Sequence, residues 1–328
     1  MRRAFRNLSA ALLALLVCAT GAGVRAQKKT EAGERGEKRR DVRSVTIPVT
    51  VRLPEKGPQG ELRYLDDLEV FEDGERQEVL AARGAGRTPM TLAVLIQDDL
   101  VSSISNEIRG IADFIRKLPP GSRVMIGYLR SGSLQVRQKF TGDLDRAARA
   151  LRIPVSSPLS APYNPFALTR DAVKRFEAQP VGRRAVLIIS DGIDTSHGFD
   201  NASPANSVDL QRTIDEAQRL SVAVYSIYAP AVGYENPSFS AFGQNSTLVS
   251  LGQGSLERLS NETGGRAFFH GTGPPVSLDK FIRDVDMLLS RQFALTYLST
   301  HAAKGFHKVR VVADLGEGEI YYPSGYTR

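Results

Sequence analysis

The sequence predicts an α/β protein with a doubly wound, mostly parallel, Rossmann-like sheet. From Thr91 onward, short apolar runs typical of buried strands alternate with longer amphipathic segments typical of helices. Two apolar runs, Leu92–Ser103 and Arg184–Thr195, end in carboxylates. Strand-like segments flank this region on both sides, so we predict a small β module at residues 45–88 and an antiparallel β tail at residues 293–328.

The N-terminal residues predict export from the cytoplasm. Residues 1–26 combine a basic start, Met1–Asn7, with an apolar run, Leu8–Gly23, and a small-residue cleavage motif that ends at Ala26. Cleavage after Ala26 leaves a charged linker, residues 27–44, that we expect to be disordered, in a periplasmic or extracellular protein without a transmembrane helix. The alternative is an uncleaved membrane anchor, for which the apolar run is short. An arginine pair near the start also fits the twin-arginine export route.

The net charge of +7 does not describe a basic surface. Residues 1–46 contain 11 of the 43 Lys and Arg and four of the 36 Asp and Glu, so residues 47–328 carry 32 of each sign. A neutral folded part predicts no nucleic-acid partner. The single cysteine, Cys18, lies in the predicted signal, which excludes a disulfide framework and a thiolate metal site.

The segments before the core have strand patterns. Val45–Leu53 alternates apolar and polar residues, which predicts a half-buried strand. Leu68–Ala81 alternates in the same way around Asp73-Gly74, a pair typical of a tight turn, and therefore predicts a hairpin.

The core then alternates between strands and helices. Its first strand, Leu92–Ile96, is entirely apolar, and the helix after it, Ile104–Leu118, has apolar residues at helical spacing and stops at Pro119-Pro120-Gly121. The further predicted strands are Arg123–Leu129, Leu134–Phe140, Ala185–Ser190, Val222–Tyr228, Arg266–Phe269, Phe293–Ser299 and Val309–Val312, and the further helices are Asp143–Leu151, Leu168–Ala178, Val208–Leu220, Ser255–Thr263 and Leu278–Arg291. This order predicts a parallel sheet with helices on both faces.

The core resembles a von Willebrand factor type A domain. A strand that ends in aspartate, a helix, and a later strand that ends in Ser190-Asp191-Gly192 carry the resemblance, and Leu259–Phe269 resembles the last core strand of that fold. The predicted type A domain covers residues 89–292. The flanking β pieces resemble an exported bacterial group of type A-related proteins. The resemblance implies a ligand site at the carboxyl edge of the sheet.

The type A family binds a metal ion with an Asp-x-Ser-x-Ser motif after the first strand, a threonine from a later loop and an aspartate after the fourth strand. On this sequence the resemblance implies Asp98, Ser102 and Asp191 as ligands of Mg²⁺ or Mn²⁺, with Asp99 and Asn164 as further oxygen donors. Such hard cations prefer oxygen ligands and keep several waters, which leaves a coordination position for an acidic group of a partner.

The motif is degenerate in this chain. Leu100 stands at a serine position, and the loop Ser156–Leu168 offers no threonine ligand. Starting the motif at Gln97 loses the leading carboxylate and starting it at Asp99 loses a serine, whereas the apolar phase of the following helix favours a start at Asp98. We therefore expect a metal site that is weak or absent. Without metal, the carboxylates would cap helices or accept hydrogen bonds from loop amides.

A long segment, Ala229–Gly254, follows a core strand and should lie near the same edge. Loops of this length in compact domains usually have a function. Its aromatic residues Tyr234, Phe239 and Phe242 form either a partner-binding patch or a small core beneath the loop.

Together these features predict a non-enzymatic binding module that recognises another protein or a cell-envelope component. One alternative is an exported hydrolase that uses His197 with a carboxylate, although the chain has no G-x-S-x-G nucleophile motif. Another is a structural component of an envelope assembly that docks through the β tail. His301 and His307 flank a predicted turn, and we expect both to be solvated.

Overall fold

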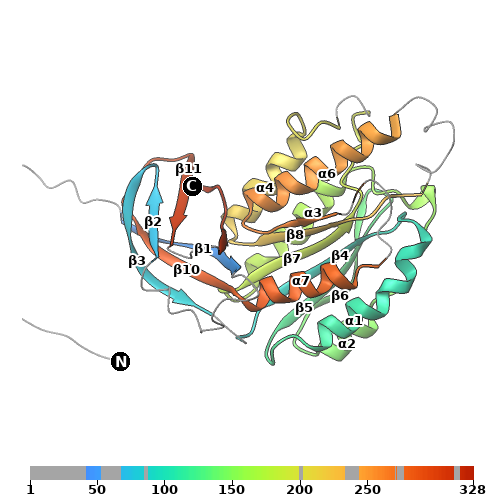
Figure 1. Cartoon of the computed structure of the whole chain (residues 1–328), viewed down its shortest axis with the longest axis horizontal. Coiled ribbons are helices and arrows are strands. Elements are labelled where there is room, and N and C mark those ends of the chain that lie inside the picture. Colours follow the sequence, from blue (N-terminus) through green and yellow to red (C-terminus); the bar gives the residue numbers. More distant parts are fainter. Residues whose placement is uncertain are drawn as a thin grey trace, which may run out of the picture. The chain divides into compact units, whose positions relative to one another are not determined.

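The computed structural model describes residues 42–52, 68–84, 88–198, 202–232, 244–269, 271, 277–313 and 318–328. These residues form one mostly parallel sheet and one antiparallel sheet (Figure 1). The predicted export signal, most of the linker, and the aromatic residues Tyr234, Phe239 and Phe242 lie outside the described ranges. Among the described helices, none combines the length and the apolar character that crossing a membrane requires.

The mostly parallel sheet confirms the predicted fold class. Its strand order is β6-β5-β4-β7-β8-β9, and only the edge strand β6 runs antiparallel to its neighbour. The order reverses between β4 and β7, which places the first strand of the core at the centre. The strands are β4 (Thr91–Gln97), β5 (Arg123–Arg130), β6 (Ser133–Thr141), β7 (Arg184–Ser190), β8 (Ala223–Tyr228) and β9 (Ala267–Phe268).

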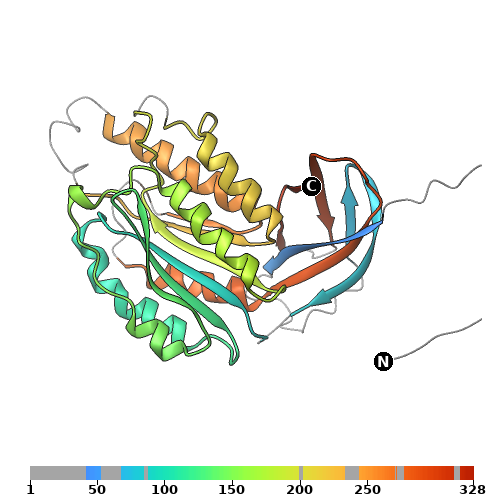
Figure 2. The ribbon, with the colours of Figure 1, turned by 180° about the vertical axis from the view of Figure 1, so that it is seen from behind.

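Helices cover both faces of this sheet, as Figures 1 and 2 show from opposite sides. Apolar side chains of α1, α2 and α7 pack on one face, and those of α3, α4 and α6 pack on the other. The α-helices are α1 (Ile108–Arg116), α2 (Leu144–Arg149), α3 (Pro165–Lys174), α4 (Val208–Arg219), α6 (Gln244–Glu262) and α7 (Asp279–Ser290); 3-10 turns lie at Ser102–Glu107, Pro158–Ser160 and Arg175–Ala178. Strand β4 contributes alternate residues to the two cores, because its side chains point to opposite faces in turn.

The antiparallel sheet combines the predicted N-terminal β strands with those of the predicted C-terminal β tail. Its order is β12-β1-β10-β3-β2-β11-β13, so strands from before and after the core alternate within one sheet. We call this sheet the β module. Its strands are β1 (Arg43–Arg52), β2 (Glu69–Glu72), β3 (Glu75–Arg83), β10 (Gln292–Ser299), β11 (Phe306–Val312), β12 (Glu319–Tyr321) and β13 (Gly325–Thr327). Each piece alone exposes strand edges, and their pairing removes most of those edges.

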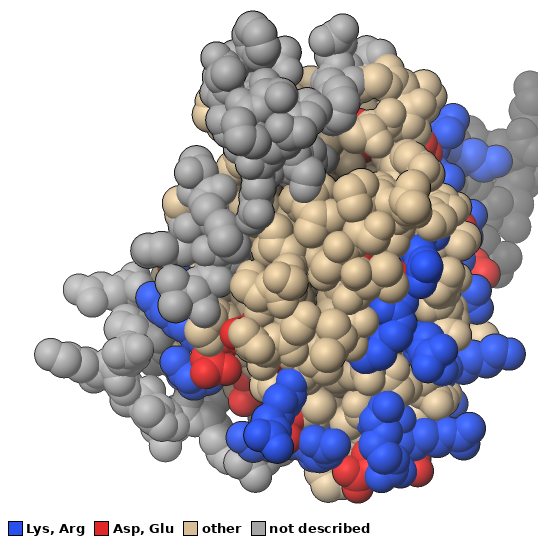
Figure 3. Space-filling model, turned by 90° about the vertical axis from the view of Figure 1, so that its right-hand side faces the viewer, with Lys and Arg blue, Asp and Glu red and all other residues tan. Residues whose placement is uncertain are grey.

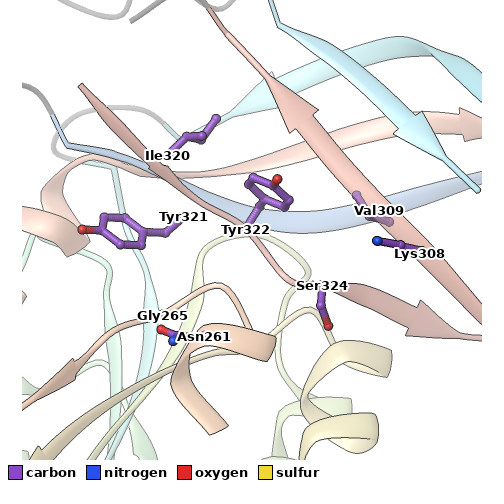
Figure 4. A pocket seen from close by; sticks show the side chains of 8 residues that line it. All are labelled: Asn261, Gly265, Lys308, Val309, Ile320, Tyr321, Tyr322 and Ser324. Atoms are coloured by element: carbon purple, nitrogen blue, oxygen red, sulfur yellow. The ribbon is translucent and has the colours of Figure 1, made fainter. Parts of the chain in front are cut away.

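The β module packs on the parallel-sheet domain through buried polar contacts. The Thr50 hydroxyl lies 3.0 Å from the Tyr225 hydroxyl, and the Ser221 hydroxyl donates to the Thr46 carbonyl over 2.5 Å. A cavity of 390 Å³ remains between the end of α6 and strands β11 and β12. Figure 4 shows Tyr321 and Tyr322 extending in different directions from the segment that lines it.

Helix α6 begins at Gln244, inside the segment predicted as a loop, and includes the shorter helix predicted at Ser255–Thr263. Its buried residues Leu248 and Val249 pack on the end of the sheet, and this tertiary contact is not visible in a segment rich in Gly, Ser and Gln. The predicted loop is therefore shorter than the sequence indicated.

Helix α6 approaches β7 closely because it carries a glycine at the contact. A Cβ atom placed at Gly252 would lie 2.0 Å from the carbonyl oxygen of Asp191, whereas a Cβ at Gly254 would meet only the Pro204 side chain at 3.2 Å. We expect Gly252→Ala to lower the free energy of unfolding by about 3 kcal/mol, since the backbone must move apart. Gly254→Ala is the control, and we expect it to stay within about 1 kcal/mol of the wild type. Urea denaturation of both variants checks this, and equal stability of the two would contradict the close packing.

Candidate functional site

The ends of β4 and β7 lie side by side, as the sequence predicted. The two strands pair in parallel with Ile96 opposite Ile189. Residues Gln97–Asp99 and Ser190–Gly192 therefore share the carboxyl edge of the sheet, on the right-hand side of Figure 1. This is the edge at which open α/β sheets bind ligands.

Gln97 connects the two strand ends. Its side chain is buried, and its amide oxygen accepts hydrogen bonds from the Ser190 hydroxyl at 2.5 Å and from the Asp191 backbone amide at 3.3 Å. Its amide nitrogen donates to Oδ1 of Asp99 at 2.9 Å. A neutral amide thus lies between the strand ends. The predicted motif started at Asp98 and assigned Gln97 no role. The alternation of side chains along β4 could have indicated that Gln97 is buried, because it places Gln97 on the same face as the core residue Ala93.

Asp98 is engaged by two arginines. It is fully buried, and its two oxygens accept from Nη1 and Nη2 of Arg152 at 2.6 and 2.9 Å. Arg130 lies 3.3 Å away, and the Val155 backbone amide donates to the same carboxylate at 3.1 Å. The guanidinium of Arg152 also lies over the Tyr128 ring, 4.0 Å from its centroid. The hydrogen bonds that Arg152 donates to Asp98 raise the pKa of the arginine. This carboxylate is therefore paired within the protein.

The other predicted ligands do not converge on one point. Asp191 is buried, and its Oδ1 accepts from the Ile193 backbone amide at 3.0 Å. Ser102 is exposed in a 3-10 turn. Asn164 caps helix α3, because its Oδ1 accepts from the Ala167 amide at 2.9 Å. Its side-chain amide donates to Asp209 at 2.7 Å.

The donor set does not fit the predicted Mg²⁺ or Mn²⁺ site. Within the described part of the chain, the carboxylates of Asp98, Asp99 and Asp191 do not form a group whose oxygens all lie within 4.8 Å of one another. Leu100, at a serine position of the motif, is fully buried and bridges to Ala231. In this structure Asp98, Asp99 and Asp191 are bonded to protein groups, and their role as metal ligands remains a prediction.

Asp98 also supports a loop that exposes apolar residues. Its main-chain oxygen accepts from the Ser156 amide at 2.9 Å and from the Ser160 hydroxyl at 3.1 Å. Four large apolar side chains of residues 152–164, which we call the apolar loop, are mainly exposed: Ile153 (60%), Val155 (45%), Leu159 (86%) and Tyr163 (55%). The predicted binding edge included Ser156–Leu168, which overlaps this loop, whereas the aromatic residues predicted to bind a partner lie outside the described ranges.

The residues around His197 have a Ser–His contact. The Ser196 hydroxyl lies 2.5 Å from Oδ1 of Asp194 and 2.9 Å from Nδ1 of His197. A hydrolytic triad places the histidine between the carboxylate and the serine. Here the serine lies between the other two, beside a cavity of 350 Å³.

The two histidines of the C-terminal part were predicted to be solvated, and the structure corrects this. His307 is almost fully buried and lies 2.7 Å from Asp73 through Nδ1, and His301 is half-buried. The reason is the pairing of β11 with β2 and β13, which brings residues more than 200 positions apart into contact. Local sequence patterns do not report such pairings.

Comparison with known proteins finds structural similarity at low sequence identity. The chain matches no family model and no curated protein in sequence. Among solved structures it is similar to the conserved hypothetical protein BatB from Bacteroides thetaiotaomicron, with 10% identity, 62% of this chain and 98% of that chain covered, and a TM-score of 0.43. An aerotolerance-related membrane protein from Bacteroides fragilis gives 10% identity, the same coverage and a TM-score of 0.40. The type A domain of SpRpn10 gives 13% identity, 60% and 95% coverage, and a TM-score of 0.37.

The strand order and the placement of helices define the class. A central first strand, an antiparallel edge strand β6, and helices on both faces agree with the fold that the sequence resemblance to a von Willebrand factor type A domain implies, and we call the domain from β4 to α7 the type A-like domain. The β module is an addition to it.

The Asp98–Arg152 pair should contribute strongly to stability. Arg152→Ala removes the bidentate partner of the fully buried Asp98 carboxylate. We expect this substitution to lower the free energy of unfolding by about 3 kcal/mol. Arg130→Ala removes one longer and more exposed contact, and should cost less than about 1 kcal/mol. Urea denaturation of both variants checks the difference. A Mg²⁺-dependent rise in the melting temperature that Asp191→Ala abolishes would contradict the pairing described here.

Asp99 should make stability depend on pH. Burial raises its pKa to about 6, the neighbouring Asp98 adds to this, and the hydrogen bond from Gln97 opposes it. Because the folded state holds the proton more tightly than the unfolded state, this contribution is present at low pH and lost as pH rises from about 4 to about 6. We expect the free energy of unfolding of Asp99→Asn, minus that of the wild type, to increase by about 3 kcal/mol across this window. Urea denaturation at several pH values, with the surface change Asp171→Asn as control, measures it; a difference independent of pH would contradict it.

Proposed function

We propose that this protein is an exported, non-enzymatic binding module that recognises another protein through the apolar loop at the carboxyl edge of its parallel sheet. The observation that carries the proposal is the exposure of four large apolar side chains within residues 152–164. Exposing apolar area to water is unfavourable by about 25 cal/mol per Å². Contiguous exposed apolar groups therefore mark surfaces that a partner covers.

The apolar loop is held in place before any partner binds. Beneath it, the buried Asp98 accepts hydrogen bonds from the Val155 and Ser156 amides. Beside it, the turn between β5 and β6 donates from the Ser131 amide to the Ser160 carbonyl at 3.2 Å, and from the Ser131 hydroxyl to the Leu159 carbonyl at 3.0 Å. A fixed loop loses little conformational entropy on association, which favours binding.

The surrounding surface suits an apolar contact. Figure 3 shows the carboxyl edge face-on, with mainly uncharged residues at the centre of its visible part and lysine and arginine along the margins. An apolar centre with a polar rim is the composition of protein interfaces. Charged residues at the rim of such an interface guide partner approach and orientation more than they add affinity.

The mode of recognition follows from the ion pairing of Asp98. Because Asp98 is bound to Arg152, recognition through a shared cation is not supported at this edge. The Ser196 hydroxyl between Asp194 and His197 likewise lacks the triad order of a hydrolase. Export is part of the proposal because of the basic, apolar and small-residue order of residues 1–26.

A pair of exposed apolar residues at opposite ends of the domain tests the proposal. Leu159 lies on the apolar loop, and Val181, 75% exposed, precedes β7 at the opposite edge of the sheet. A photo-crosslinking amino acid at position 159, in the cells that produce the protein, should give one defined adduct, and the same group at position 181 should give none. Leu159→Asp should weaken binding of that partner more than about tenfold at an unchanged melting temperature, while Val181→Asp should not, because only the first charge enters the interface.

Two outcomes would contradict this function. Equal crosslinking at both positions would show that the apolar loop is not a specific surface. Adducts that contain only further copies of this chain would favour a structural role in an assembly.

A further inference from the structure

A cluster of carboxylates and histidines lies within the β module, apart from the carboxyl edge of the parallel sheet. Glu72 and Asp73 come from the end of β2 and the turn before β3, and His301 and His307 come from the turn after β10 and from β11. Strand β11 pairs with β2, which brings the two groups together (Figure 1).

The donor atoms of this cluster are close to one another. Nδ1 of His307 lies 2.7 Å from Oδ2 of Asp73 and 3.6 Å from Oε1 of Glu72. One ligand atom from each of these three residues lies within 4.8 Å of the others, and within the described residues this is the only such group. Nδ1 of His301 lies 3.4 Å from Oε1 of Glu72.

Glu72 is buried and incompletely paired. Its side chain is fully buried, and Oε1 accepts from the Ser299 hydroxyl at 2.8 Å and the Tyr326 hydroxyl at 3.1 Å. Oε2 has no hydrogen-bond partner, and neither does the buried Nδ1 of His301. Both ion-pair partners that the structure gives Glu72 are histidines. A buried carboxylate of this kind requires a cation close to it.

The orientation of the His307 ring specifies what its Nδ1 can do. Nε2 lies 2.9 Å from the carbonyl oxygen of Ala303, which can only accept, so Nε2 carries a hydrogen. Nδ1 then points at two carboxylates and must hold either a proton or a metal ion. Metal-binding histidines commonly donate their second ring N–H to a backbone carbonyl in this way, which fixes the ring.

We propose that Glu72, Asp73 and His307 bind a divalent transition-metal ion of the zinc type, with water completing its coordination. Mixed imidazole and carboxylate donors suit Zn²⁺, whereas Mg²⁺ and Ca²⁺ prefer oxygen ligands alone. Tetrahedral Zn²⁺ with bonds of about 2.0 Å separates its ligand atoms by about 3.3 Å. The spacings of 2.7 and 3.6 Å from Nδ1 of His307 to the two carboxylates lie on both sides of that value.

Such an ion would join segments from before and after the type A-like domain. It would tie the β2–β3 hairpin to strand β11, which follows the whole of that domain in sequence. Because a metal that binds only the folded state stabilises it, the β module should become more stable as the free ion concentration rises. This site is independent of the proposed function of the apolar loop.

The wild-type protein gives the first test. Full-length protein is treated with a chelator, dialysed, and titrated with Zn²⁺ by calorimetry and with Co²⁺ by visible absorption. We expect one ion per chain, strong absorption typical of four-coordinate Co²⁺, and a melting temperature that rises with Zn²⁺ and is unaffected by excess Mg²⁺. Binding at other than one ion per chain, or no binding, would overturn the proposal.

Two variants and one control locate the site. Asp73→Asn keeps the turn, because asparagine also tolerates the φ of +50° found at this position, and His307→Gln removes the imidazole. Each should weaken Zn²⁺ binding more than about tenfold at an unchanged circular dichroism spectrum, whereas His197→Gln should bind like the wild type. Equal binding by all four proteins would overturn the proposal.

Discussion

The polar groups at the buried ends of β4 and β7 must find partners inside the protein, and much of the carboxyl edge is arranged around this requirement. The amide of Gln97 meets Ser190, Asp191 and Asp99 at once, so both strand ends are joined by a single side chain. On the other face of β4, the carboxylate of Asp98 is paired with Arg152 and with a backbone amide. Unsatisfied groups in these positions would be costly, and the hydrogen bonds fix where the following loops run.

The same contacts that stabilise the fold also position the loop that we propose to bind a partner. The ion pair that satisfies Asp98 also sets the position of the apolar loop, since the same residue binds the Val155 and Ser156 amides. A type A-like edge with a bound cation would offer a charged coordination site to an acidic partner. Here the charge is neutralised internally, and the exposed groups are apolar side chains. A chain that keeps the fold and loses the ligands can therefore still present a surface at the same edge.

The β module also contains buried polar groups that must find partners inside the protein. Its strands come from both sides of the type A-like domain, so neither end can complete the sheet alone. Helix α7 ends at Ser290 and β10 begins at Gln292, which couples the two sheets directly. The buried Glu72 lies where strands from before and after the type A-like domain pair, next to the hydroxyls of Ser299 and Tyr326 and to two histidines. Charges this deep are tolerated only with close counter-charges.

The sequence by itself determined the fold class, since strand and helix periods are local properties. The entirely apolar run Leu92–Ile96 and the amphipathic Ile104–Leu118 were enough to predict a covered parallel sheet, and Ser190-Asp191-Gly192 located its carboxyl edge. Only the tertiary structure decided what the carboxylates do. The side of β4 on which Asp98 lies, the arrival of Arg152 from another loop, and the burial of His307 beside Glu72 depend on contacts between distant segments. A shift of the strand register by one residue moves a side chain to the other face of a sheet, and no local sequence pattern specifies which residues it contacts there.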